Sequence, residues 1–304
     1  MEPFKVHILG CGSAKPTQRH SPACQVISTR GKLFMIDCGE GAQSGFARQG
    51  FNMNRLGNIF ISHNHGDHVF GLPGLISTMG LLGRTADLHI HGPQQMEEFM
   101  TMLLRTYCEG MTYNVLFHSV DTTRHQIVYQ DRSVTVWSIP LSHRIPCSGY
   151  LFREVPSLPH IRREMIDAYG IPVSQINNIK AGASWVTEDG TLIPNERLTI
   201  PAEPPRSYAY CSDTAYQPAL SDLLKGITLL YHEATYPQEL LARAQETCHS
   251  TALQAAMIAR NAKVGRLCIG HYSGRIKDET AHLKEATEIF PNTVLADEGL
   301  ILEL

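Results

Sequence analysis

Three histidines and an aspartate fall within six residues of this chain, in the segment ISHNHGDH that supplies His63, His65, Asp67 and His68. An apolar run typical of a strand, NIFIS, ends just before them, and Gly66 lies among them. Neither a strand nor a helix turns four side chains so close in sequence toward one place. The segment therefore predicts a tight loop at a strand end, where functional side chains are common.

Imidazole and carboxylate groups at this spacing are metal ligands, and zinc is bound by both at about 2.0–2.2 Å. We expect the loop to send His63 and His65 to one ion, and Asp67 and His68 to a second. Two divalent ions roughly 3.5–4 Å apart around a shared water form a common hydrolytic arrangement. Diiron oxidoreductases use similar loops but tend to have glutamate at the position of His65, so zinc and hydrolysis are favoured. Manganese or iron remains open as an occupant of the same ligands.

Three more polar residues follow apolar, strand-like runs far from the loop. His143 ends VTVWSIPLSH, Asp213 follows SYAYCS, and His271 follows RLCIG. Each alone is more typical of a capping or surface residue than of a ligand, but together they supply the ligands that the loop lacks. The expected assignment is His63, His65 and His143 on the first ion, Asp67, His68 and His271 on the second, and Asp213 bridging both.

Composition bounds the class of protein only loosely. The chain has 304 residues and a formal net charge of −3, so any contact with RNA has to come from a local basic patch. Its eight cysteines include no CxxC pair, which indicates buried, reduced thiols. The N-terminus lacks the apolar stretch of a signal peptide, and no run approaches the ~18 apolar residues of a membrane span. We expect a cytoplasmic protein without a membrane partner.

Strand-like runs alternate with helical patterns along most of the chain. The first third has the strands KVHILG, CQVIST, KLFMIDC and NIFISH, followed by helical patterns at Leu72–Leu82 and Gln94–Tyr107. The last third alternates strand (ITLLYHE, RLCIG) with helix (STALQAAMIARNA, DETAHLKEATEIF). This order predicts the α/β class, with two sheets packed face to face and helices outside, a four-layer αββα sandwich formed by one domain over residues 1–304.

The segment from about 153 to 206 differs in composition from the rest of the chain and predicts a protruding insertion within that domain. It contains seven prolines, a helix-like piece at Ile161–Tyr169, and a probable hairpin, WVTEDGTLI, that turns at Asp189–Gly190. A proline-rich segment of this length between two core strands is typical of an insertion rather than a second domain.

Motifs along nearly the whole chain carry a family resemblance. They are LGCGSAKPT (9–17), IDCGEGAQ (36–43), SHNHGDHVFGLPG (62–74), PLSH and GYLF within 140–152, YCSDT (210–214), HEATY (232–236), HST (249–251) and GHYSGRIKD (270–278). The chain resembles the metallo-β-lactamase superfamily and, within it, ribonuclease Z, the tRNA 3′-end processing endonucleases. The HxHxDH loop marks only the superfamily, whereas DCGEG, GDHxFGLPG, HEAT and HST are more specific. The resemblance implies a metallo-β-lactamase fold, two Zn²⁺ per chain, a homodimer and a precursor tRNA substrate.

The resemblance also implies catalytic roles. Asp67 would take a proton from the attacking water, and His249 would act as the general acid that protonates the leaving ribose oxygen. Glu233 would hold His249 in the correct tautomer and favour its charged form. On its own, HST before a helical pattern also indicates a helix start with Ser250 or Thr251 near the N-cap, and the two readings are compatible.

The GHYSGRIKD motif and the insertion depart from the family pattern. Arg275 resembles a family arginine near the substrate phosphates, although it is equally typical of a solvated loop, and Gly274 and Ile276 replace two usual members of its motif. The family insertion is typically a basic arm that clamps tRNA. Residues 151–206 carry six Arg/Lys against seven Asp/Glu, which predicts a shallow salt dependence of RNA binding.

Two alternatives to an endoribonuclease remain. A hydrolase of small esters (lactone, thioester, phosphodiester or sulfate ester) fits the same ligands, but a dedicated acid such as His249 argues for a poorer leaving group. A metal-containing RNA-binding protein without activity would not need the full ligand set.

Overall fold

The computed structural model describes residues 3–304 and divides the chain into two compact units. The larger unit combines the residues up to Arg153 with Arg206–Leu304, and the smaller unit is Glu154–Pro205. The smaller unit lies within the segment that the sequence singles out as an insertion.

Two seven-stranded sheets form the centre of the larger unit. The first sheet has the order β18-β1-β2-β3-β4-β5-β6. Its strands are β1 (Lys5–Gly10), β2 (Cys24–Thr29), β3 (Lys32–Ile36), β4 (Leu56–Phe60), β5 (Leu88–Pro93), β6 (Val115–Val120) and β18 (Ile301–Glu303). Pairing is antiparallel from β18 to β3 and parallel from β3 to β6, so this sheet is mixed.

The second sheet has the order β17-β16-β15-β14-β9-β8-β7. Its strands are β7 (Ile127–Gln130), β8 (Val134–Leu141), β9 (Cys147–Glu154), β14 (Ser207–Cys211), β15 (Leu229–Glu233), β16 (Arg266–Gly270) and β17 (Thr293–Leu295). Strands β14 to β17 run parallel, so β14, β15 and β16 present their carboxyl ends at one edge.

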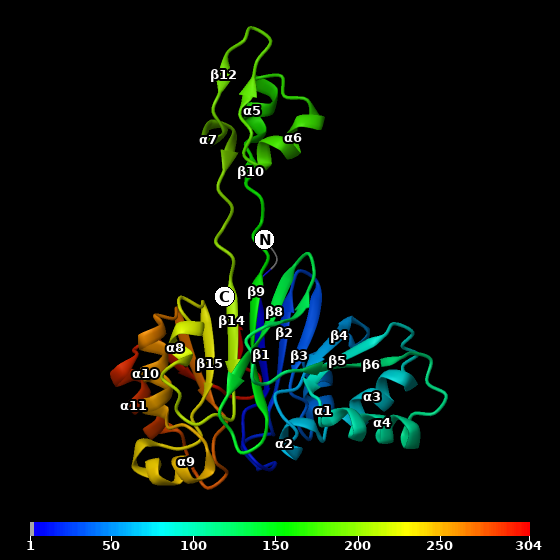
Figure 1. Ribbon diagram of the computed structural model, residues 1–304, viewed down its shortest axis with the longest axis vertical. Helices are drawn as coiled ribbons and strands as arrows, with labels where there is room; N and C mark the ends of the chain where they lie inside the picture. Colours follow the sequence, from blue (N-terminus) through cyan, green and yellow to red (C-terminus); the bar gives the residue numbers. More distant parts are fainter. Residues whose placement is uncertain (1–2) are drawn as a thin grey trace. The chain divides into compact units, whose positions relative to one another are not determined.

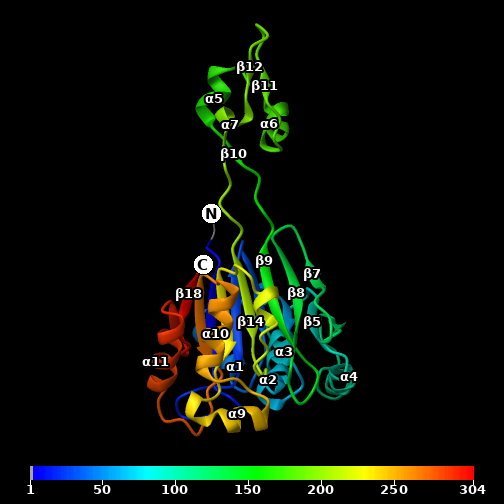
Figure 2. The same cartoon turned by 60° about the vertical axis from the view of Figure 1, so that its left-hand side comes forward.

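Helices cover the outer faces of both sheets (Figures 1 and 2). On the side of the first sheet lie α1 (Ala42–Arg48), α2 (Gly66–Val69), α3 (Leu72–Leu81) and α4 (Met96–Tyr107). On the side of the second lie α8 (Leu220–Leu223), α9 (Leu241–Thr247), α10 (Ala252–Ala262) and α11 (Thr280–Ile289). None of the helices in residues 3–304 has both the length and the apolar character to cross a membrane.

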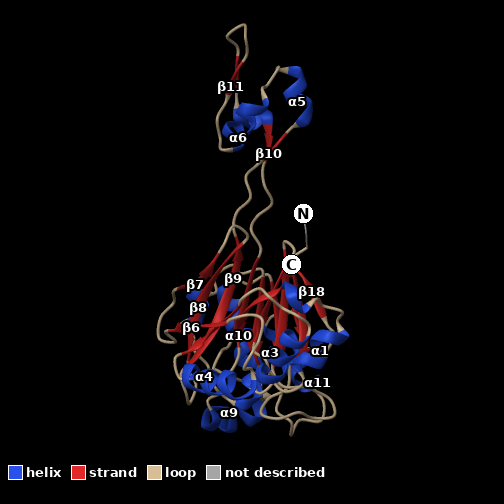
Figure 3. Ribbon diagram, turned by 90° about the vertical axis from the view of Figure 1, so that its right-hand side faces the viewer, coloured by secondary structure: helices blue, strands red, loops and turns tan. Residues whose placement is uncertain are grey.

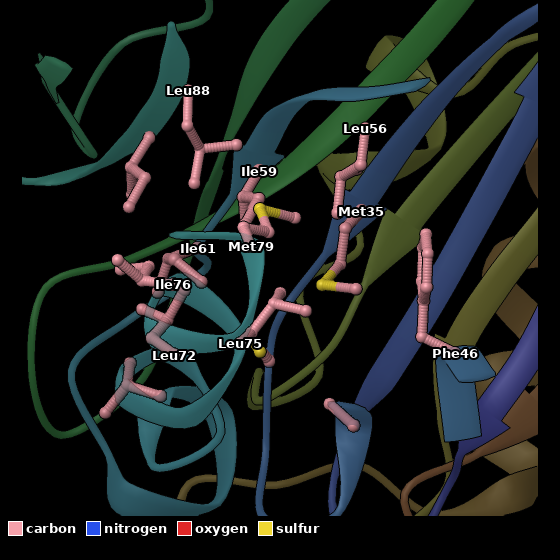
Figure 4. Packing of buried hydrophobic residues seen from close by; sticks show 14 of the residues in the cluster. Met35, Phe46, Leu56, Ile59, Ile61, Leu72, Leu75, Ile76, Met79 and Leu88 are labelled. Atoms are coloured by element: carbon pink, nitrogen blue, oxygen red, sulfur yellow. The ribbon is translucent and has the colours of Figure 1, made fainter. Parts of the chain in front are cut away.

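Three apolar clusters separate the four layers. Figure 1 shows the strands in the middle with helices on both sides, and Figure 3 colours the same strands red and helices blue in a view turned by 90°. Between the sheets, Phe34 of β3 packs edge-on against Phe152 of β9, with ring centroids 5.8 Å apart. Between the first sheet and its helices, Met35 and Ile59 meet Leu75 of α3 (Figure 4). A third cluster joins the second sheet to α8, α10 and α11. The predicted αββα sandwich is confirmed.

The smaller unit has an apolar cluster of its own, built around Ile171, Ile179, Ile193 and Leu198. Its elements are β10 (His160–Ile161), α5 (Arg163–Ala168), α6 (Val173–Lys180), β11 (Trp185–Val186), β12 (Leu192–Ile193), α7 (Asn195–Leu198) and β13 (Thr199–Ile200). Strands β11 and β12 pair antiparallel, as WVTEDGTLI predicts. Gly190 turns the hairpin at φ 83°, where a side chain would be strained.

Candidate metal centre

All seven ligands expected from the sequence converge at one edge of the paired sheets. The loop after β4 and helix α2 supply four of them, and the segments just after β8, β14 and β16 supply the other three. They form two groups in which the donor atoms lie within 4.8 Å of one another. The first group is His63, His65, His143 and Asp213, and the second is Asp67, His68 and His271.

Asp213 lies between the two groups with one carboxylate oxygen facing each. Its Oδ2 is 3.7 Å from Nε2 of His63 and 3.7 Å from Nε2 of His143. Its Oδ1 is 3.3 Å from Nε2 of His68 and 3.0 Å from Nε2 of His271. This is the geometry of a carboxylate that can bridge two cations.

The backbone is left-handed at three residues that follow strands at this edge. Asp37, Asp213 and His271 have φ values of 56°, 62° and 64°. Non-glycine residues adopt this region rarely and at a cost of roughly 1–3 kcal/mol, and such residues gather at functional sites. The sharp turn lets each side chain point across the end of its own sheet instead of along its face.

The donor set fits divalent cations. Nε2 of His68 and Nε2 of His271 are buried and, apart from their ion-pair contacts with Oδ1 of Asp213, have no hydrogen-bond partner within residues 3–304. A buried polar atom without a partner costs free energy, which a bound cation would recover. Burial lowers the pKa of His63, His65 and His143, so these imidazoles are neutral and their lone pairs are available. Imidazole nitrogens with carboxylate oxygens are the donors that zinc prefers.

Asp37, to which sequence analysis assigns no role of its own, contacts the second group on the Nδ1 side of His68. Its Oδ2 lies 2.7 Å from Nδ1 of His68 and accepts hydrogen bonds from the hydroxyls of Ser62 (2.9 Å) and Tyr210 (2.8 Å). Its Oδ1 accepts from the backbone N–H of Ser62 at 2.8 Å. A carboxylate at Nδ1 fixes the tautomer of His68 and leaves Nε2 for the cation site.

Two other imidazoles are oriented in the same way. Nδ1 of His143 lies 3.1 Å from the carbonyl oxygen of Cys248, and Nδ1 of His271 lies 3.1 Å from the hydroxyl of Thr235. Both therefore present Nε2 to the centre. Asp67 accepts a hydrogen bond of 2.6 Å from the backbone N–H of Ala14, which ties it to the loop after β1.

His249 and Glu233 form a buried pair beside the cation ligands. Nδ1 of His249 is 2.8 Å from Oε1 of Glu233. Glu233 also accepts from the backbone N–H groups of Thr214 (2.7 Å) and Ser250 (3.1 Å) and from the hydroxyl of Thr235 (2.6 Å). Burial opposes a charged imidazole here, but the Glu233 carboxylate outweighs it and raises the pKa of His249 to about 9. The Glu233 carboxylate thus favours the charged, proton-donating form of His249.

His249 lies just before a capped helix, and the structure confirms the helix start expected at HST. Thr251 is the N-cap of α10, and its side chain accepts from the backbone N–H of Gln254 in a capping box. Ser250 instead donates to the carbonyl oxygen of Thr214 at 2.8 Å. The cap fixes the residues that follow His249 and so holds the imidazole in place.

A cavity of about 800 Å³ is lined by five of the seven candidate ligands and by His249. Arg275 lies in its wall, as does Phe70 at the end of α2. The cationic side chains that line it are Lys15, Arg144, Arg243 and Arg275. The cavity therefore presents positive charge around a carboxylate-and-imidazole floor, which suits an anionic substrate.

Comparison with known proteins points to one family. Residues 4–144 match a family model described as anti-Pycsar protein Apyc1, which is less than half of the chain. The chain is 55% identical over 304 residues to the ribonuclease Z of Bacteroides fragilis (strain YCH46), covering 100% of both proteins.

Two solved structures share the fold at low sequence identity. Human tRNase Z, short form, has a TM-score of 0.71 at 22% identity and covers 98% of each chain. The metallo-β-lactamase fold protein YhfI from Bacillus subtilis has a TM-score of 0.70 at 19% identity and covers 100% of each. The predicted metallo-β-lactamase fold is thereby confirmed. With more than half of its residues shared over the full length of a ribonuclease Z, the chain belongs to the ribonuclease Z family.

Proposed function

We propose that this ribonuclease Z is a zinc-dependent endoribonuclease that cleaves precursor tRNA directly 3′ of the acceptor stem. The products would be a tRNA with a 3′-hydroxyl and a trailer with a 5′-phosphate. The observation that carries the proposal is the placement of Asp213, with one oxygen toward each of two groups of imidazoles. A centre of this form suits two Zn²⁺ ions per chain.

His63, His65 and His143 would hold one ion, Asp67, His68 and His271 the other, and Asp213 both. When bound, such a pair supplies Lewis-acid chemistry that activates water near neutral pH and offsets charge on phosphoryl oxygens. The chain's own residues then have to position the RNA and move two protons.

The first proton leaves the attacking water, whose oxygen forms the new bond to phosphorus. Asp67 is assigned as its acceptor and lies at the floor of the cavity. Burial opposes the charge on Asp67, but the neighbouring His68 and His271 together outweigh burial and hold the pKa of this carboxyl well below its usual range. The position of Asp67 beside His68 and His271 supports its ligand role directly.

The second proton goes to the 3′ oxygen of the ribose as its bond to phosphorus breaks. His249 is assigned as the donor because Glu233 keeps it charged and orients Nδ1, which leaves Nε2 for the substrate. Arg275 in the cavity wall would bind phosphate oxygens through its planar guanidinium.

The pairing of His249 with a fully buried carboxylate also separates this proposal from hydrolysis of small esters on the same fold. Lactones and thioesters release leaving groups that need less help from an acid. Turnover of bis-p-nitrophenyl phosphate compared with a lactone and a thioester tests this choice, since preference for either of the latter would favour the alternative.

The decisive experiment is cleavage of a precursor tRNA by the zinc-loaded protein, with both product ends mapped. A 3′-hydroxyl on the tRNA and a 5′-phosphate on the trailer are expected. Cleavage elsewhere, or a 5′-hydroxyl trailer, would overturn the proposal.

We also propose a homodimer in the cytoplasm. Support for the dimer comes from apolar side chains left exposed at the ends of α3 and α4, where Leu81 is 85% and Tyr107 76% exposed. Light scattering of the purified protein tests the dimer. The eight cysteines are unpaired and all but Cys248 are buried, which suits a reducing compartment.

A further inference from the structure

We propose that Arg144 forms a subsite for a substrate phosphate. The phosphate is the one on the 5′ side of the nucleotide whose 3′ oxygen leaves, one phosphodiester before the cleaved bond. This inference rests on the proposed function and adds a contact to the acceptor strand of the RNA.

Arg144 lies beside the proposed proton donor. It directly follows His143, and both line the cavity together with His249. The ring centroids of His143 and His249 lie 5.1 Å apart. The position next to His143 and the shared cavity wall thus place Arg144 on the His249 side of the cavity.

Arg144 is exposed and free to bind an anion. Its side chain makes no hydrogen bond or ion pair with any other residue in the described part of the chain. Arg243, which lines the same cavity, is engaged differently, because its Nη1 donates to Glu246 at 2.6 Å. An unpaired arginine can give both of its parallel N–H groups to phosphate oxygens without first breaking an ion pair.

An exposed arginine without a partner among residues 3–304, in the wall of the cavity that faces the metal centre, can offer charge-assisted hydrogen bonds to an anionic group of the substrate. Phosphate oxygens are the anions that a nucleic acid brings, whereas a small ester with a single reacting group brings no second one.

The position of the 3′ leaving oxygen determines which way the RNA runs through the cavity. His249 gives its proton to the 3′ oxygen, so the nucleotide that carries this oxygen lies against His249. The phosphate attached to the 5′ side of the same nucleotide is then the nearest one upstream, on the wall that Arg144 shares. Phosphates of the trailer leave on the other side of the broken bond.

The test is a double-mutant cycle between protein and RNA. Precursor tRNA is prepared with a neutral methylphosphonate in place of the phosphodiester directly before the cleaved bond. A control substrate carries the methylphosphonate two nucleotides further upstream. The wild type and Arg144→Ala are assayed for kcat/KM on the unmodified and both modified substrates. Arg132→Ala is the matched protein control, because Arg132 is exposed in the turn between β7 and β8 and does not line the cavity.

We expect the neutral linkage and Arg144→Ala each to lower kcat/KM about tenfold, as expected for one partly exposed charge-assisted contact, and their combination to lower it no further. The control linkage should act equally on both enzymes, and Arg132→Ala should match the wild type. If the neutral linkage lowered kcat/KM by the same factor in the wild type and in Arg144→Ala, the subsite would be overturned while the proposed function stood. Failure of the wild type to cleave the unmodified precursor would overturn the proposed function and the subsite together.

Discussion

Asp213 holds one carboxylate oxygen toward each group of imidazoles, so a neutral replacement acts on both cation sites at once. Asp213→Asn preserves the shape of the side chain, and asparagine tolerates the left-handed backbone at this position. We expect the variant to fold, to bind fewer than one zinc per chain, and to lose at least about 100-fold in turnover, as when a bridging or supporting ligand is removed. Metal analysis beside a cleavage assay measures both effects.

A matched control for Asp213→Asn is Asp131→Asn, since Asp131 is a partly buried carboxylate that pairs with Lys32 away from the metal centre. Its zinc content should equal that of the wild type. If Asp213→Asn retained both ions, the bridging assignment would be wrong.

His249 is expected to matter for chemistry and not for metal binding. His249→Ala removes the proton donor while Asp213 and the six other assigned ligands remain. Loss of a positioned general acid typically costs about 10²–10⁴ in rate. The loss should be large on precursor tRNA and small on bis-p-nitrophenyl phosphate, because p-nitrophenolate leaves without protonation. Equal losses on both substrates at unchanged zinc content would argue against the acid role.

Glu233 sets the pH range over which His249 can donate. Its carboxylate raises the pKa of His249 to about 9. The acid form of His249 therefore persists through neutral pH and is lost as the pH rises through about 9. A bound cation acts in the opposite direction. Glu233→Gln removes the negative charge, and we expect the alkaline limb of the kcat profile to move to lower pH. An unmoved limb would show that another group limits activity there.

The convergence of the candidate metal ligands was predictable, because four of them lie within residues 63–68 and only three had to be found elsewhere in the chain. Asp37 and Thr235 were not assigned roles for the opposite reason. Asp37 acts on His68 and Tyr210, which are 31 and 173 positions away in the chain. No local pattern distinguishes such a carboxylate from a strand-end cap, and its place in the DCGEG motif indicates only family membership.

At the scale of elements, the loops after β3 and β4 are held together by glycines in close contact. A side chain on Gly39 would collide with the backbone oxygen of Asp67, and one on Gly71 would collide with the backbone oxygen of Gly39. These contacts explain why DCGEG and GDHxFGLPG occur together: each loop needs the glycine of the other to bring Asp37 and Asp67 to the centre.

Gly39→Ala should therefore push the loop that carries Asp67 away from the centre. We expect weaker binding of the second zinc and an unfolding free energy lower by about 1–3 kcal/mol, as overpacking usually costs. Zinc titration and thermal unfolding measure these effects. Gly57→Ala is the control, because no atom lies within 4 Å of an added side chain there and it should leave both quantities unchanged. Unchanged zinc affinity in Gly39→Ala would refute the role of this contact.

Helices and strands with a clear periodicity of apolar residues were predicted from the sequence, and those without such a periodicity were missed. Helices α3 and α10 follow apolar periodicity, and Thr251 marks the start of α10. Helices α1 and α9 start without a side-chain cap and have few buried residues, so the sequence offers little to mark them. Strand β9 is buried at seven of eight positions and therefore lacks the alternation that indicates a strand.

At the scale of the whole molecule, the apolar packing of the smaller unit is separate from that of the larger unit. None of the three apolar clusters of the larger unit includes a residue of Glu154–Pro205, which packs around its own isoleucines. The proline content and the hairpin turn made this segment recognisable in sequence. The unit Glu154–Pro205 contains four Arg/Lys and seven Asp/Glu, so it is acidic. Its electrostatic contribution to RNA binding is therefore expected to be small.

Replacing Glu154–Pro205 by a short Gly/Ser linker should leave zinc content and turnover of bis-p-nitrophenyl phosphate unchanged, because the ligands and their supports all lie outside it. KM for precursor tRNA should rise if the segment contacts the RNA by shape or hydrogen bonds. The slope of log kcat/KM against log salt should change by less than about one, because each phosphate contact contributes roughly 0.7–0.9 to such a slope and an acidic segment makes few. A change of three or more in this slope would show that the few Arg and Lys side chains of the segment contact RNA phosphates, which its acidic composition argues against.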